Sequence, residues 1–150
     1  MDKDDAGDRC GRRYIASVLR EWEMDVIVHE PWEAMPRDDR FGELGPVVSV
    51  ALRTVLRDAP RGDVPSEFIR MALRHGRYRR LQGCPEEVLS YEIGALRRAL
   101  RGALRSSSLR VDVVLLALDR AEDLWPIAKR ASALGFREPY LDDLSDRARP

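Results

Sequence analysis

The sequence FIRMALRHGRYRRLQGCPEEVLSYEIGALRRALRGAL, residues 68–104, contains two apolar patterns separated by a short break. In both halves apolar residues recur at spacings of three and four, which is the period of one face of an α-helix. The first half contributes Phe68, Ile69, Ala72, Leu73 and Gly76, and the second half contributes Leu89, Ile93, Leu96, Leu100, Ala103 and Leu104. The stretch therefore predicts two helices that face each other as an antiparallel hairpin.

The break between the two patterns has the composition of a tight corner. Gly83 can adopt the left-handed backbone conformation that ends many helices. Pro85 has a fixed φ that suits the first position of the next helix. We therefore expect the chain to reverse direction between Gly83 and Pro85.

Helical spacing of apolar residues also occurs before and after this hairpin. It predicts three further helices, over residues 9–29, 46–58 and 109–134. Residues 31–45 hold two prolines and two glycines and predict a loop with one helical turn. Because no segment alternates at period two, we expect an all-α bundle of four to five helices.

The last predicted helix is apolar on more than one face. Its second stripe contains Val113, Leu116 and Ala117. Such a helix either lies at the centre of its own bundle or is covered by a second copy of the chain. We expect Pro126 to kink this helix and Gly135 to end it.

The chain length is typical of one domain. Residues 1–8 are charged and predict a disordered tail with Asp8 as an N-cap, and residues 9–135 predict the helical domain. Residues 136–150 predict a hook that docks through Phe136, Tyr140 and Leu141 and then continues as a tail.

Composition bounds the environment and the partners. The 26 basic and 26 acidic residues cancel, so no net charge draws the chain to nucleic acid or to a membrane. Cys10 and Cys84 form no close pair and no signal peptide precedes them, which indicates a cytoplasmic protein. The longest apolar run, residues 113–118, is far below the roughly 20 residues that span a bilayer.

The sequence contains no recognisable catalytic, metal or cofactor motif. His29 and His75 are far apart, and neither belongs to a Glu-x-x-His motif. Nucleophile-elbow, phosphate-loop and dinucleotide motifs are missing from the sequence. Cys84 precedes a helix whose dipole would lower its pKa and favour a redox role, although a buried capping residue is the simpler interpretation. We therefore expect a non-enzymatic protein without a cofactor.

Two residues of the first helix of the hairpin have both a structural and a functional interpretation. His75 is either a hydrogen-bonded packing residue or a ligand or pH-sensing group. Gly76 inside a helix costs about 1 kcal/mol, which indicates that another helix or a ligand approaches closely. Close helix packing is the interpretation we favour.

Arginines are concentrated on the hairpin. They are either a solvated face paired with acids elsewhere or a docking surface for an acidic partner or phosphate. Nucleic-acid binding is the weaker alternative, because the neutral chain lacks a motif that reads bases. The predicted partner surface contains Arg70, Arg74, Arg77, Arg80, Arg98 and Arg101.

The segment from His75-Gly76-Arg77 to Gln82-Gly83 is followed by a helix containing Ser90-Tyr91-Glu92 and Leu96-Arg97. Over about residues 10–125 the chain resembles the input domain named after the N-terminal region of the RsbT co-antagonist RsbRD. That family has a His-Gly-x-x-Arg-x-x-Gln-Gly-like stretch leading into Leu-x-x-Glu-Tyr-x-x-Leu-Arg. The order Tyr91-Glu92 and the residues Cys84 and Pro85 depart from it.

The resemblance implies an all-α sensory or interaction module that stands ahead of histidine-kinase, STAS and related output domains and has no catalytic residues. The chain then corresponds to an excised input domain or a stand-alone regulator, since little sequence follows Arg137. The matching residues would form a structural joint or a sensing pocket: His75, Gly76, Arg79, Gln82, Gly83, Tyr91 and Arg97.

Three functions follow from these observations. The first is a non-catalytic bacterial signalling module, a homodimer that binds a signalling partner or repacks its helices. The second is a small-molecule or haem-type sensor built around His75. The third is weak nucleic-acid binding through the arginine cluster.

Overall fold

The structure, a computed structural model, describes residues 3–57 and 62–138, and within these ranges it contains helices and no strand. A 3-10 turn, η1 (Trp32–Ala34), and a short helix, α2 (Arg37–Phe41), follow the first helix. The longer helices are α1 (Lys3–Val26), α3 (Leu44–Leu56), α4 (Ser66–Leu81), α5 (Glu87–Arg105), α6 (Val111–Ala121) and α7 (Leu124–Arg137). The predicted all-α bundle is confirmed.

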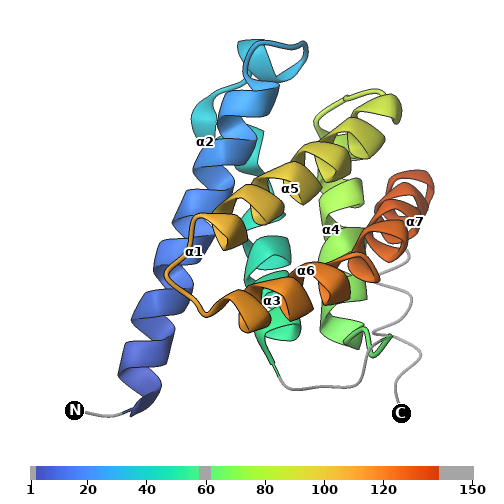
Figure 1. Cartoon of the computed structure of the whole chain (residues 1–150). Helices are drawn as coiled ribbons and strands as arrows, with labels where there is room; N and C mark the ends of the chain where they lie inside the picture. Colours follow the sequence, from blue (N-terminus) through green and yellow to red (C-terminus); the bar gives the residue numbers. More distant parts are fainter. Residues whose placement is uncertain (1–2, 58–61, 139–150) are drawn as a thin grey trace.

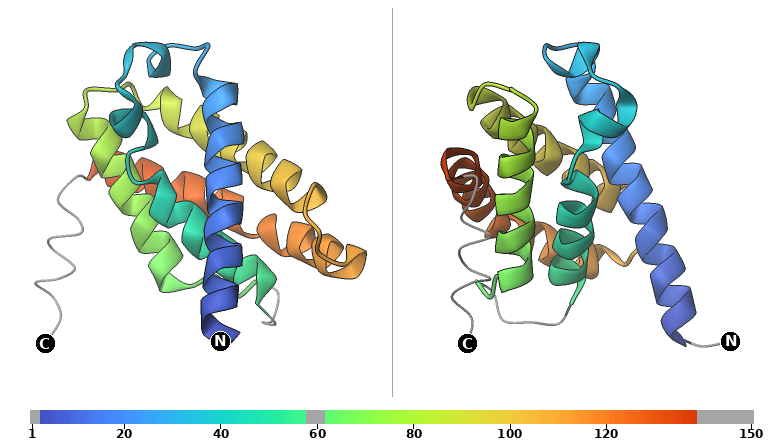
Figure 2. Two further views of the ribbon diagram at one scale, coloured as in Figure 1. Left: turned by 90° about the vertical axis from the view of Figure 1, so that its left-hand side faces the viewer. Right: turned by 180° about the vertical axis from the view of Figure 1, so that it is seen from behind.

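The long helices form two layers (Figure 1). Helices α1, α3 and α4 stand side by side and run up, down and up, and α5, α6 and α7 cross them. Seen from behind, α3 and α4 lie in front of the crossing helices, and the N-terminal part of α1 projects beyond the bundle (Figure 2). The loop after α1 and the corner between α4 and α5 lie at the same end of the molecule.

The hydrophobic core fills the space between the two layers. Its largest members include Trp22 from α1, Leu44 from α3 and Phe68 from α4, all fully buried. Leu96 and Leu100 of α5 close it from the other layer. Because each such side chain contributes about 1.5–3 kcal/mol through burial, these contacts hold the crossing helices against α1 and α3.

The corner between α4 and α5 is present, with Gly83 at φ +77°. The expected packing of the two apolar stripes against each other is wrong. Helix α4 packs extensively along α7 and also on α3, whereas α5 packs mainly on α1. The two helices meet near the corner and diverge from it (Figure 1).

Small residues explain why α7, and not α5, covers α4. A Cβ added at Gly76 would lie 1.9 Å from the backbone oxygen of Ser132, and one added at Gly135 would lie 2.0 Å from that of Leu73. The backbones of α4 and α7 are therefore almost in contact. The close approach predicted at Gly76 is confirmed, and Gly135 lies inside α7 at this crossing and does not end a helix at residue 134.

The predicted helix over residues 109–134 is two helices. The chain breaks at Glu122 and Asp123, between α6 and α7. Pro126 is the third residue of α7, in the first turn, where a backbone N–H has no helical acceptor in any case. Pro126 therefore fits the start of a new helix and does not kink a continuous one.

The other boundaries differ by a few residues. Helix α1 begins at Lys3, inside the segment predicted as a tail, and ends at Val26, before the cis Glu30–Pro31 bond. Phe136 is a buried residue of α7, and the remaining hook residues, Tyr140 and Leu141, lie outside the described ranges.

Candidate functional site

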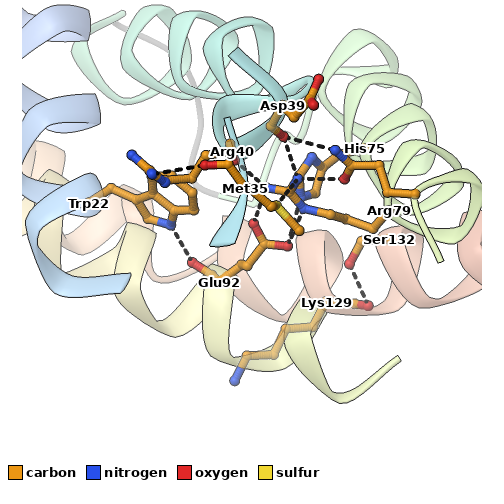
Figure 3. Close-up of polar contacts among 10 residues, drawn as sticks. Trp22, Met35, Asp39, Arg40, His75, Arg79, Glu92, Lys129 and Ser132 are labelled. Atoms are coloured by element: carbon orange, nitrogen blue, oxygen red, sulfur yellow. Dashed lines mark hydrogen bonds and ion pairs between the residues drawn. The ribbon is translucent and has the colours of Figure 1, made fainter. Parts of the chain in front are cut away.

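The buried face of helix α4 ends in a charged residue, Arg79. Phe68, Ala72, His75 and Arg79 follow one another at helical spacing, and all four side chains are buried. Arg79 is 0 % exposed. Its guanidinium points from α4 to Glu92, which is also 0 % exposed and lies on α5 beyond the corner (Figure 3).

Arg79 and Glu92 form a two-pronged ion pair. The Nε atom of Arg79 donates to Glu92 Oε1 at 2.8 Å, and Nη2 donates to Oε2 at 2.8 Å. Burial would raise the pKa of Glu92, but the nearby His75 and the hydrogen bonds from His75 and Arg79 outweigh it and hold the pKa below its ordinary value. Glu92 is therefore an ionised carboxylate in the protein interior.

The other donors of Arg79 reach the end of α2. Nη1 donates to the backbone oxygen of Asp39 at 2.8 Å and to Gln82 Oε1 at 2.7 Å, while Nη2 donates to the backbone oxygen of Arg40. The last carbonyls of a helix have no partner within it, so Arg79 caps α2 from α4. All five N–H donors of the guanidinium have acceptors.

His75 completes the buried ionic cluster, which we define as His75, Arg79 and Glu92. Its Nε2 atom lies 3.2 Å from Glu92 Oε1. Since Glu92 is ionised and can only accept, Nε2 carries the proton and donates it. The Nδ1 atom is buried and has no partner among the described residues.

A second buried arginine extends the network to α1 and η1. Arg40 donates to Glu23 Oε2 at 2.8 Å, to the backbone oxygen of Trp32 at 3.0 Å and to that of Met35 at 3.0 Å. Trp22 Nε1 donates to the backbone oxygen of Glu92 at 3.3 Å. The cluster and Arg40 together therefore join α1, η1, α2, α4 and α5.

The structure brings together only part of the predicted joint. His75, Arg79 and Gln82 converge on Asp39 or Glu92, Gly83 makes the corner, and Gly76 lies at the crossing with α7. Two predicted residues lie elsewhere on the surface of α5.

The ring of Tyr91 packs against the rings of Trp32 and His29, with centroid distances of 5.3 and 5.2 Å. Arg97 forms an exposed ion pair with Glu122 at 3.1 Å.

The members of the predicted arginine surface come from two helices, α4 and α5, and several of them have partners within the chain. On α5, Arg98 pairs with Asp25 at 2.9 Å, and Arg101 lies 3.8 Å from Glu122. On α4, Arg80 lies 5.3 Å over the ring of Phe136 and donates to the backbone of the same residue. The remaining members belong to α4: Arg70 and Arg74 are exposed, and Arg77 is half-buried.

The predicted dimer face on α6 is partly wrong. Ala117 is buried against the core and Val113 is half-buried, because α6 turns this side towards α3 and α5. Leu116 is 49 % exposed, as the prediction requires. The apolar side chains that face outward with it are Val111, 74 % exposed, and Leu115, 63 % exposed.

Cys84 does not have the activated thiol that its position before α5 suggests. Its side chain is buried, and burial raises its pKa; Arg79 lowers it and Glu92 raises it further, so the net pKa is above the ordinary value. The expected lowering of this pKa is therefore wrong, because burial disfavours the charged thiolate, and the simpler interpretation of Cys84 as a buried residue is confirmed.

In residues 3–57 and 62–138, no three or more His, Cys, Asp or Glu side chains gather where they could hold a metal ion. Within the same ranges no helix combines the length and apolar character that crossing a bilayer requires. Comparisons of the chain with protein-family models, with curated proteins and with solved structures found no match.

Sequence reasoning missed Glu92 and Arg40 as members of the network. Glu92 had a detectable signal: it lies three residues after Leu89 and four before Leu96, on the apolar stripe of α5. A carboxylate on a buried stripe requires a buried partner, and Arg79 occupies the matching stripe of α4. Arg40 had no such signal, because it lies in a segment without apolar periodicity.

Proposed function

We propose that this chain is a non-catalytic signalling module that acts through protein contacts and forms a homodimer through the outer face of α6. The observation that carries this proposal is the exposure of three neighbouring apolar side chains, Val111, Leu115 and Leu116, on that face. Contiguous apolar side chains rimmed by polar residues are typical of interaction sites on soluble proteins.

The buried ionic cluster supports the non-catalytic part of the proposal. A catalytic acid, base or nucleophile must reach a substrate, but His75, Arg79 and Glu92 are at most 1 % exposed and bind one another. The cluster instead fixes the relative positions of four helical segments. Two of its residues, His75 and Arg79, are among those that carry the resemblance to the RsbRD input domain, and a third such residue, Gln82, accepts a hydrogen bond from Arg79. The resemblance is therefore consistent with a structural joint.

Sedimentation velocity tests the proposed dimer. We expect the unmodified chain to sediment as a dimer and the Leu115→Glu/Leu116→Glu variant as a monomer, because four carboxylates would be buried in the interface. Met24→Glu is the matched control, since Met24 is 72 % exposed on α1 and lies outside the proposed interface. An unmodified chain that remains monomeric at every concentration would reject the proposal.

The two other functions have less support. A sensor built around His75 would need a ligand to enter a closed core, because the unpartnered Nδ1 atom of His75 is buried and Nε2 already binds Glu92. Nucleic-acid binding would depend on the exposed Arg70 and Arg74 of α4, because the arginines of α5 are paired with Asp25 and Glu122. A steep decrease of duplex binding with salt concentration would favour the latter function.

A further inference from the structure

A cavity of about 530 Å³ lies between the loop after α1 and the start of α5. One wall is the continuous segment His29, Glu30, Pro31 and Trp32, and the other contains Pro85, Glu87, Val88 and Tyr91. These two segments belong to the same end of the molecule (Figure 2). The volume lies in the range of small-molecule sites in proteins.

Aromatic rings form much of this cavity. The centroid of Tyr91 lies 5.3 Å from that of Trp32 and 5.2 Å from that of His29, whose ring is turned by 69°. Trp32 is only 2 % exposed, so the rings of Tyr91 and His29, which are exposed, provide most of the aromatic surface. Aromatic faces are negatively polarised and attract a cation within about 6 Å of the ring centre.

The charges of the lining favour the same kind of ligand. Glu30 and Glu87 lie on opposite walls, and the lining contains no lysine or arginine. Arg98 is the cation near Tyr91; it lies 5.9 Å from the ring centroid and is paired with Asp25 at 2.9 Å. Tyr91 therefore already has a cation–π contact with Arg98, which is not part of the lining. Glu30 and Glu87 provide the negative charge that would attract a second cation into the cavity.

We propose that this cavity binds a small organic cation that carries an alkylated ammonium group. An alkylated ammonium combines positive charge with an apolar surface, which suits rings and carboxylates together. A bare metal ion suits the site less, because the described residues offer no group of three metal-binding side chains. This proposal does not depend on the dimer proposed above. It concerns the ligand that a signalling module would sense, whereas the dimer concerns how such a module would contact a second copy.

The walls of the cavity are held in place by the buried network. The backbone oxygen of Trp32 accepts from Arg40 Nε at 3.0 Å, and the backbone oxygen of Arg40 accepts from Arg79. On the other wall, Tyr91 precedes Glu92, the partner of Arg79. A site whose walls are fixed before binding loses less conformational entropy when the ligand enters.

Nuclear magnetic resonance titration with choline chloride tests the proposal, because the chain contains three tryptophans whose indole N–H signals report separately. We expect choline to shift the signal of Trp32 saturably and to leave that of Trp125, which is not part of the cavity lining, unchanged. The compound 3,3-dimethyl-1-butanol has the shape of choline without its charge. We expect it to cause a much smaller shift.

Charge-removing variants locate the binding. Glu30→Gln/Glu87→Gln should weaken choline binding about tenfold, as expected for the loss of two nearby partly screened charges. Glu33→Gln, at an exposed position outside the lining, is the control for net charge and should change binding less than twofold. Tyr91→Leu keeps apolar bulk but removes the ring, and it should also weaken binding severalfold.

Three outcomes would overturn the proposal. The first is no saturable shift of Trp32 at about 20 mM choline, a concentration that nearly saturates a millimolar site. The second is an equal response to the uncharged alcohol. The third is equal loss of binding in Glu33→Gln and in the double variant, because binding would then follow net charge alone. None of these results depends on the oligomeric state, so they are distinguishable from failure of the proposed dimer.

Discussion

The interior of the α4–α5 corner and the outer face of α6 reverse the usual distribution of residue types. At the corner, Arg79 and Glu92 are both 0 % exposed, whereas on α6 Val111 and Leu115 are 74 % and 63 % exposed. Charged side chains are rarely buried unless they are paired. The comparison teaches that burial in this fold is decided by available partners and not by polarity alone.

The two regions also differ in what they contribute. Removing two charges from water costs several kcal/mol, which the attraction within the buried pair only roughly offsets. The cluster therefore adds little net stability compared with a well-packed apolar core, but it fixes where α2, α4 and α5 meet. The exposed residues of α6 fix nothing within the chain, so their effect should appear only when something covers them.

Breaking the buried pair should have the largest effect. Arg79→Met leaves Glu92 as an uncompensated buried charge, so we expect a loss of about 3–5 kcal/mol in the free energy of unfolding, measured by urea denaturation. The Arg79→Met/Glu92→Met variant removes both charges and should lose less than Arg79→Met alone. If the loss in the double variant equals the loss in Arg79→Met plus the loss in Glu92→Met alone, the two residues are not coupled.

Filling the crossing between α4 and α7 should have the next largest effect. Gly76→Ala places a methyl group where Ser132 O lies 1.9 Å away, so the two backbones must separate, at a cost of about 1–3 kcal/mol. Gly94→Ala is the matched control on α5, because its Cβ would meet only the flexible end of Arg98 at 3.7 Å. Thermal unfolding should show the control unchanged or more stable by up to about 1 kcal/mol.

Acid should weaken the corner through Glu92. Its folded pKa lies below the ordinary value of 4.5, so the unfolded chain binds the proton first as pH falls. The stabilisation is complete above the ordinary carboxyl range and is lost as pH falls through the folded pKa, with a slope of up to about 1.4 kcal/mol per pH unit for this one group. Urea denaturation between neutral and acid pH measures the free energy of unfolding of the unmodified chain and of Glu92→Gln. If this free energy changes equally with pH in both chains, Glu92 does not contribute to the pH dependence.

The helices were predictable because they depend on local periodicity, and their packing was not. The stripe from Phe68 to Gly76 identifies α4, and Gly83 identifies the corner, without reference to the rest of the chain. Which helix covers that stripe depends on shape: Gly76 and Gly135 allow α7 to approach more closely than α5 can. Two glycines separated by almost sixty positions carry no signal that pairs them in a single sequence.

The candidate site was predictable to the same degree. His75, Arg79 and Gln82 were identified as one joint, and they lie together. Tyr91 was grouped with them, yet its ring points to the aromatic cavity, because successive residues of a helix project about 100° apart. His29 was predicted to end a helix that in fact stops at Val26, and Trp32 gave no signal, since an irregular segment has no period from which a side-chain direction follows.

Changes on the outer face of α6 should have the smallest effect on the isolated chain. Leu115→Gln/Leu116→Gln removes two apolar side chains that are 63 % and 49 % exposed, so at low protein concentration the free energy of unfolding should change by less than about 0.5 kcal/mol. If the face joins two copies, association stabilises the unmodified chain by mass action, and the difference should grow as protein concentration rises. Denaturation at two concentrations a hundredfold apart therefore separates an interface from a merely exposed face. A difference that is large at low concentration would mean that these leucines pack within one chain, and the contrast with the buried corner would then disappear.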